Sequence, residues 1–332
     1  MDTPIMLLFF NRPDTLKETF NWIRKVKPKQ LFLVQDGPRP GNNQDLEKIY
    51  QCREIVESVD WECQVQKNYS DKNLTCDVRE YSGIDWCFRF VDRLLILEDD
   101  CVPADTFYDF CSELLERYKN DNRIGMISGF VRCGTIESAE YDYVFSNTCA
   151  GCGWATWKRA WDEAVKIRRL EISEFERLVR KHKSTIENYC LSYKDYAEKA
   201  IALRKLESEK CELISWENIW GLSMIFNNQL AISPRHNMIK YAGICKDATH
   251  SADSTALLPR TVRQMFTQPA VDVSFPLKHP EYIVRDFEYE KNDYKQYFGQ
   301  SSIKNHLESC ALKIRHGRFD LLLKSLFRKI RG

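Results

Sequence analysis

Over the first 130 residues, short apolar runs alternate with stretches whose apolar residues recur every three or four positions. The runs are typical of buried strands, and the three-to-four spacing is typical of helices that pack one face on a sheet. This alternation predicts an α/β fold built from βαβ units, with a mainly parallel central sheet and flanking helices. The predicted strands are residues 5–10, 31–34, 63–66, 94–97 and 124–128.

Unusual polar segments follow three of these strands. Residues 11–14, 35–39 and 98–100 follow the first, second and fourth predicted strands. In open sheets of this kind, ligands bind beyond the carboxyl ends of the strands. We therefore expect the three segments to converge on one edge of the sheet.

The fourth strand ends in three successive carboxylates, Glu98, Asp99 and Asp100. Adjacent negative charges repel one another and cost desolvation energy unless a cation or hydrogen-bond donors offset them. Mg²⁺ and Mn²⁺ prefer oxygen ligands, commonly one or two carboxylates together with phosphate oxygens and water. The segment thus favours a divalent metal site. The alternative is a solvated acidic turn before the next helix, although Asp105 alone could cap that helix.

Charge and cysteine content limit the partners and the compartment. With 49 basic and 48 acidic residues, the 332-residue chain has a net charge of +1 and no global field for holding nucleic acid. Thirteen cysteines at irregular spacings indicate reduced thiols rather than a disulfide framework. The N-terminus lacks a basic leader, and no stretch approaches the roughly 20 apolar residues of a spanning helix. We expect a cytoplasmic protein.

Several motifs occur together between about residues 4 and 255. They are FNRPDTL, a QDGPR turn, NL and IDW before the acidic segment, EDD after an apolar strand, GWATWKRAW, and a late DATHS. The set resembles GT-A glycosyltransferases, in particular bacterial relatives of the N-acetylglucosaminyltransferase that begins complex N-glycans. The resemblance implies a nucleotide-sugar-binding half at 1–130 and an acceptor-binding half at 131–258. Residues 259–332 would form a C-terminal extension with a helical appendage.

The resemblance also implies an activity. Such an enzyme moves a sugar from a UDP-sugar donor, such as UDP-GlcNAc or a related hexose, to a saccharide or lipid-linked acceptor. It uses Mn²⁺ or Mg²⁺, and the relatives suggest surface polysaccharide biosynthesis as the setting.

The resemblance assigns roles to five of the polar residues. Asp100 would be the direct metal ligand, while Glu98 and Asp99 would order the donor ribose and sugar. Asp36 would accept a hydrogen bond from the uracil, and Arg12 would contact the nucleotide. A carboxylate suits a base edge that donates, and a guanidinium pairs with phosphate or stacks on a base. The alternatives are a plain turn at Asp36 and a surface arginine at Arg12.

Glu217 is the candidate catalytic base. Direct displacement needs a group that deprotonates the acceptor hydroxyl on the face opposite the leaving nucleotide. Glu217 follows a tryptophan where the relatives carry Trp-Asp, and this match implies inversion of configuration. The alternative is a first-turn acidic residue that only complements the dipole of a helix capped by Ser215.

Two further residues are predicted near the donor. His250 matches a late histidine that holds the metal or the diphosphate in GT-A enzymes, although a lone histidine is more often structural. The segment 151–161 is rich in glycine and tryptophan, and we expect it to be irregular and to line the site. Most of its tryptophans should pack in the core, with Trp154 as a wall of the donor or acceptor site.

The end of the chain predicts a basic amphipathic helix over residues 303–330. Such a helix can lie on anionic lipid, here at the inner face of the cytoplasmic membrane. It can also dock on the domain with a solvated basic face. The sequence leaves both interpretations open.

Two other functions remain open. A sugar-1-phosphate nucleotidyltransferase also combines an α/β sheet with a carboxylate-bound metal, but it needs an early glycine-rich pyrophosphate loop, and residues 11–16 contain no glycine. A noncatalytic polysaccharide-binding or assembly protein would keep the fold alone.

Overall fold

The computed structural model describes residues 2–148, 150–191, 195–210, 212–243, 255–297, 301–319 and 321. Its strands are β1 (Ile5–Phe9), β2 (Gln30–Gln35), β3 (Gln64–Tyr69), β4 (Arg93–Glu98), β5 (Cys101–Pro103), β6 (Ile124–Ser128), β7 (Tyr143–Ser146), β8 (Trp154–Trp157), β9 (Leu230–Pro234) and β10 (Ile239–Tyr241). Its helices are α1 (Pro13–Val26), α2 (Asn43–Glu57), α3 (Cys76–Cys87), α4 (Phe107–Arg117), α5 (Lys158–Arg168), α6 (Ile172–Lys181), α7 (Lys183–Tyr189), α8 (Tyr196–Lys210), α9 (Trp216–Phe226), α10 (Arg260–Phe266), α11 (Phe287–Tyr297) and α12 (Ser301–Arg315), with the 3-10 turn η2 (Thr255–Leu257).

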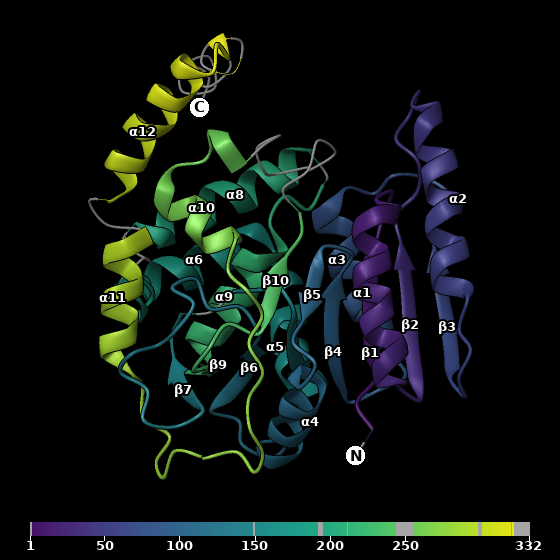
Figure 1. The fold of residues 1–332 in the computed structure, drawn as a ribbon. Coiled ribbons are helices and arrows are strands. Elements are labelled where there is room, and N and C mark those ends of the chain that lie inside the picture. Colours follow the sequence, from purple (N-terminus) through teal and green to yellow (C-terminus); the bar gives the residue numbers. More distant parts are fainter. Residues whose placement is uncertain are drawn as a thin grey trace.

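One large sheet organises the described part of the chain, with the strand order β3-β2-β1-β4-β8-β6-β9-β7. The strands β1 to β4 are mutually parallel, and β6 is parallel to β9. Only β8 and β7 run the other way, because β8 pairs antiparallel with both β4 and β6, and β7 pairs antiparallel with β9. The predicted α/β class with a mainly parallel sheet and flanking helices is confirmed (Figure 1).

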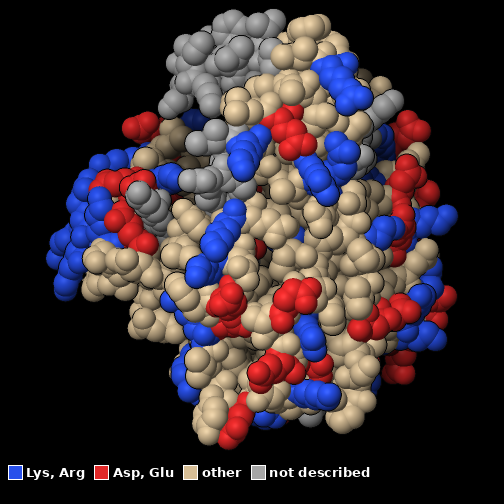
Figure 2. Space-filling model, turned by 60° about the vertical axis from the view of Figure 1, so that its left-hand side comes forward, with Lys and Arg blue, Asp and Glu red and all other residues tan. Residues whose placement is uncertain are grey.

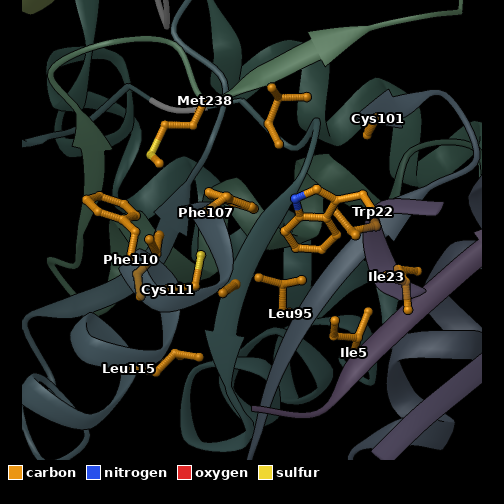
Figure 3. Close-up of a cluster of buried hydrophobic side chains, with 14 of the residues drawn as sticks. Ile5, Trp22, Ile23, Leu95, Cys101, Phe107, Phe110, Cys111, Leu115 and Met238 are labelled. Atoms are coloured by element: carbon orange, nitrogen blue, oxygen red, sulfur yellow. The ribbon is translucent and has the colours of Figure 1, made fainter. Parts of the chain in front are cut away.

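Alternate residues of β1, β2 and β4 enter two different cores. In β1, Ile5 and Leu7 pack with α1 and α4, whereas Met6 and Leu8 face the core that includes α3, α5 and α9. Figure 3 shows part of the first core, where the Trp22 indole also donates to the Ala104 carbonyl at 2.9 Å. Strands covered by helices on both faces carry continuous apolar runs, which explains why the first strands were readable from sequence.

The segment 151–161 corrects one expectation. Residues 151–153 are irregular as expected, but Trp154–Trp157 forms β8 inside the sheet, and α5 follows directly. Four residues form a strand here because they pair on both sides, with Leu95 of β4 and Ile127 of β6 both opposite Ala155. Pairing across such sequence distances is invisible in a local pattern.

The C-terminal extension is partly built into the sheet domain. Residues 269–286 run back across it, with backbone hydrogen bonds such as Val271 to the Asn237 carbonyl and Asp286 to the Phe145 carbonyl. In α11, the buried Asp293 accepts from the Arg132 guanidinium at 2.6 and 2.9 Å. Helix α12 covers the first part of the predicted 303–330 helix and extends away from the body (Figure 1), while residues 320 and 322–330 lie outside the described residues.

Charges on this side of the molecule are mixed. Figure 2 turns the left-hand side of Figure 1 toward the viewer and shows basic and acidic side chains interspersed across this face. Within the described residues, no helix has the length and apolar character needed to cross a membrane.

Candidate active site

The strand order places a crevice at the carboxyl edge of the sheet. In the order β3-β2-β1-β4, the strands β2 and β3 lie on one side of β1, whereas β4 lies on its other side. The side on which successive strands are added therefore changes between β1 and β4, although these two strands are parallel. In doubly wound sheets, ligands bind at such a switch point. Arg12, three residues after β1, and Asp99, directly after β4, meet there and line the same cavity.

The cavity measures about 280 Å³, near the lower end of the range for ligand pockets. It is enclosed by the ends of β1, β2 and β4 and by the beginning of α3. Its polar lining comes from Asn11, Arg12, Asp36, Arg39, Asn73, Thr75, Cys76, Asp77, Arg79, Glu98 and Asp99. The predicted convergence of the three polar segments is therefore present.

The acidic segment is buried rather than solvated. Asp99 is 1% exposed and Asp100 is 4% exposed, which rules out the interpretation of a solvated acidic turn. The Arg12 guanidinium bridges the two, donating to Asp100 Oδ2 at 2.8 Å and to Asp99 Oδ1. The Phe10 backbone N–H also donates to Asp99 Oδ2 at 3.2 Å. Arg12 is thus no surface arginine, and one cation offsets two buried anions.

Burial and mutual repulsion disfavour the charged forms of the crowded carboxyl groups. Burial raises the pKa of Asp99 to about 6, even though Arg12 lowers it. Burial also raises the pKa of Glu98, and repulsion from Glu80 and Asp100 adds to that shift. A group of crowded carboxylates with one guanidinium favours the binding of further positive charge.

The donor atoms suit a hard divalent cation. Within the described ranges, no three His, Cys, Asp or Glu side chains form a complete metal cage. Mg²⁺ and related ions are usually held by one or two carboxylates plus phosphate oxygens, so such a site does not need three protein ligands. Asp100 is a buried carboxylate that directly follows the cavity residue Asp99, so it is the candidate ligand.

Asp36 fixes the loop that closes the cavity. Its Oδ1 accepts from the backbone N–H of Gly37 at 2.9 Å and of Leu74 at 2.8 Å. A side chain at Gly37 would collide with Lys72, since a Cβ there would lie 2.5 Å from the Lys72 backbone nitrogen. Burial raises the pKa of Asp36. The segment is therefore a tightly packed part of the cavity wall and not an ordinary turn.

Glu217 lies in the first turn of α9 and is exposed. Burial raises the pKa of Cys76, a cavity residue, and nearby carboxylates that include Glu98 and Glu217 raise it further. The predicted base thus lies within electrostatic range of the cavity. The expected cap of α9 is absent, because Ser215 makes no side-chain cap hydrogen bond and Asp77 Oδ1 accepts from the Trp216 backbone N–H at 3.3 Å instead.

The acidic residues of α3 were not predicted as part of the site. Glu80 is 6% exposed and accepts from the Trp216 indole N–H at 2.9 Å. Burial raises its pKa, and the Glu217 carboxylate adds to the shift. Glu80 precedes the buried Ile84 by one helical turn, so a charged residue on the apolar stripe was the available signal.

The position of Trp154 differs from its predicted place in the wall of the sugar site. Its side chain is fully buried, and its ring stacks on Trp216 with centroids 5.8 Å apart and planes 15° apart. It also packs against Trp220 at 5.4 Å. A ring enclosed in this way cannot form a wall of a sugar site. Trp157 and Trp161 are buried too, so all three belong to the core.

We expect Trp154→Ala to lower the free energy of unfolding by about 3–5 kcal/mol, since it removes a large buried ring. Urea denaturation followed by circular dichroism measures this change. Tyr282→Ala is the matched control, because that aromatic ring is 69% exposed and its loss should cost no more than about 0.5 kcal/mol. Equal stability of the two variants would contradict the buried position of Trp154.

His250 lies outside the described residues, so its role stays a prediction. The described chain approaches the acidic cluster seven residues earlier, at Gly243. A Cβ at that position would lie 2.3 Å from Asp100 Oδ2, and the Ala242 N–H donates to the Asp100 carbonyl at 2.7 Å.

No family model matches the chain, and no curated protein matches it. Solved structures with some similarity include a 4-diphosphocytidyl-2C-methyl-D-erythritol synthase from Anaerococcus prevotii, with 10% identity over 51% of this chain and 77% of that one, at a TM-score of 0.33. A cytidylyltransferase from Leptospira borgpetersenii has 14% identity over 57% of this chain and 74% of that one, also at a TM-score of 0.33. With TM-scores below 0.5, these similarities bear on neither activity nor substrate.

Proposed function

We propose that this chain is a metal-dependent glycosyltransferase that moves a sugar from a UDP-sugar to a saccharide or lipid-linked acceptor with inversion of configuration. The observation that carries the proposal is the bridge of Arg12 to the buried Asp99 and Asp100 at the switch point of the sheet. A nucleotide diphosphate needs positive charge at such a crevice, and a metal bound by a carboxylate together with an arginine supplies it.

Different residues at the site would bind different parts of the donor. Asp100 would hold Mn²⁺ or Mg²⁺, assisted by His250, and the bound metal would offset the charge of the departing diphosphate. Arg12 pairs with carboxylates in the described structure, and the same planar donors suit phosphate oxygens. Asp36 would accept from the base, while Glu98 and Asp99 would orient the ribose and the sugar.

Glu217 would remove the proton from the acceptor hydroxyl. Its exposed position at the start of α9 leaves it accessible to an acceptor, and the neighbouring Trp216 is held by Asp77 and Glu80. These bonds hold the start of α9, from which the Glu217 side chain extends; a general base must be positioned in this way.

The connection after β1 favours this function over nucleotidyl transfer. Only residues 10–12 separate β1 from α1, and α1 begins directly with Pro13. A glycine-rich pyrophosphate loop has no room in three residues, none of which is glycine. The two cytidylyltransferase-type neighbours therefore do not alter the proposal.

The product distinguishes the candidate functions. Purified protein is incubated with Mn²⁺ and UDP-GlcNAc, UDP-glucose or UDP-galactose, and the released UDP and free sugar are quantified by chromatography. We expect slow release of UDP that EDTA abolishes. A parallel incubation with UTP and a sugar 1-phosphate should yield no pyrophosphate. Pyrophosphate formation would indicate a nucleotidyltransferase, and absence of both products across the donor panel would indicate a binding protein.

A further inference from the structure

Among the described residues, Asn305 and Glu308 of α12 make side-chain hydrogen bonds to the α10 region. The Glu308 carboxylate accepts from the Arg260 backbone N–H at 3.0 Å, and Thr261 donates to Asn305 at 2.5 Å. These contacts attach α12 to the α10 region and turn Asn305 and Glu308 inward. Leu307 and Ile314 lie roughly 100–120° around the helix from Glu308, and both are exposed.

The exposed side of α12 carries an apolar stripe. Leu307, Ala311 and Ile314 follow the spacing of one helical face and are all exposed, Leu307 to 64% and Ile314 to 52%. Phe319, just beyond the helix, is 58% exposed. In the described residues, this is a rare place where large apolar side chains line up on a single exposed helix face.

Basic residues border the stripe at both ends. Lys304 lies one turn before Leu307, and Arg315 lies one turn after Ala311; both are exposed. Among the exposed residues that the structure describes between 304 and 319, none is acidic. The half-buried Glu308, one turn after Lys304 on the same side of the helix, accepts from the Arg260 backbone N–H. The exposed residues of this segment therefore include apolar and basic side chains and no acidic one.

We infer that α12 and Phe319 lie in the surface of an anionic lipid bilayer. Leucine, isoleucine and phenylalanine side chains would enter the acyl boundary, while Lys304 and Arg315 would remain at the headgroups. Anionic lipids attract such cations, by roughly fivefold in affinity for each one near the surface. This inference is independent of the proposed function.

A second copy of the chain fits this face less well. In a twofold dimer the same patch meets itself, so Lys304 and Arg315 of one copy would face cations of the other. Three aligned side chains on one helix also offer far less than the roughly 800 Å² per partner of a standard interface. Charge complementarity therefore favours lipid over self-association.

Vesicle flotation with the full chain tests the inference. Vesicles contain either phosphatidylcholine alone or equal parts of phosphatidylcholine and phosphatidylglycerol. We expect binding to the anionic vesicles that weakens with salt, and little binding to the neutral ones. The double variants Leu307→Glu/Ile314→Glu and Lys304→Glu/Arg315→Glu should each bind at least about tenfold more weakly.

Matched controls separate the helix from general effects. Leu46→Glu changes a leucine of α2 that is 43% exposed, and Lys199→Glu changes an exposed lysine of α8; both should bind as the wild type does. Circular dichroism checks that all variants fold. Wild-type binding by either α12 double variant would overturn the inference. A dimer in light scattering that Leu307→Glu/Ile314→Glu dissociates would overturn it in favour of self-association.

Discussion

Replacing Asp100 with asparagine lowers Mn²⁺-dependent UDP release at least about 100-fold, because the amide is a much weaker metal ligand than the carboxylate. Charge stabilisation by a bound metal contributes several kcal/mol, and about 3 kcal/mol corresponds to that factor. The amide has nearly the shape of the carboxylate, so the bond from Arg12 to Oδ2 can persist and the fold should be kept. Initial rates of UDP release over a range of Mn²⁺ concentrations measure the effect.

Asp105→Asn is the matched control. Asp105 lies five residues later, its side chain is 65% exposed, and it pairs with Lys25 on the surface. We expect this variant to release UDP at the wild-type rate. Wild-type release by the Asp100 variant would refute the metal assignment, and equal losses in both variants would trace the effect to the local fold.

The second large effect is expected for Glu217→Gln. A positioned general base typically contributes about 10²–10⁴-fold to the rate, and glutamine keeps the size of the side chain without its basicity. The turnover number should therefore fall by a factor in this range, while affinity for UDP and Mn²⁺ stays unchanged. Hydrolysis of the donor, in which water replaces the acceptor, gives the turnover number, and titration calorimetry gives the affinity.

Glu212→Gln provides the comparison, because Glu212 is exposed and lies five residues before Glu217. It should retain full turnover. If Glu217→Gln keeps the wild-type turnover number, another group is the base. If it weakens UDP binding as much as it slows turnover, Glu217 supports donor binding instead.

The parts of the fold that were predictable are those with a strong local signal. The ends of β1, β2, β3, β4 and β6 lie within three residues of the predicted ends. Each of these strands was recognisable because segments with helical periodicity flank it. By contrast, β8 is a strand only because β4 and β6 flank it on both sides. The return of residues 269–286 across the domain likewise depends on long-range hydrogen bonds.

The candidate site was predictable where residues follow strands. Arg12, Asp36 and Glu98 occupy one cavity because parallel strands end on the same edge of a sheet. What could not be predicted is the pairing within it: Arg12 bridges Asp99 and Asp100, and Glu80 holds Trp216 from a neighbouring helix. Trp154 was misplaced because an aromatic residue near a site has the same local pattern as one in the core.

A crystal grown with UDP and Mn²⁺ and measured near the manganese absorption edge is the most direct test of the proposed activity. An anomalous peak within bonding distance of Asp100 and the diphosphate, with the uracil beside Asp36, is the predicted result. UDP bound elsewhere, or diphosphate in the cavity with no manganese at Asp100, would contradict the proposal.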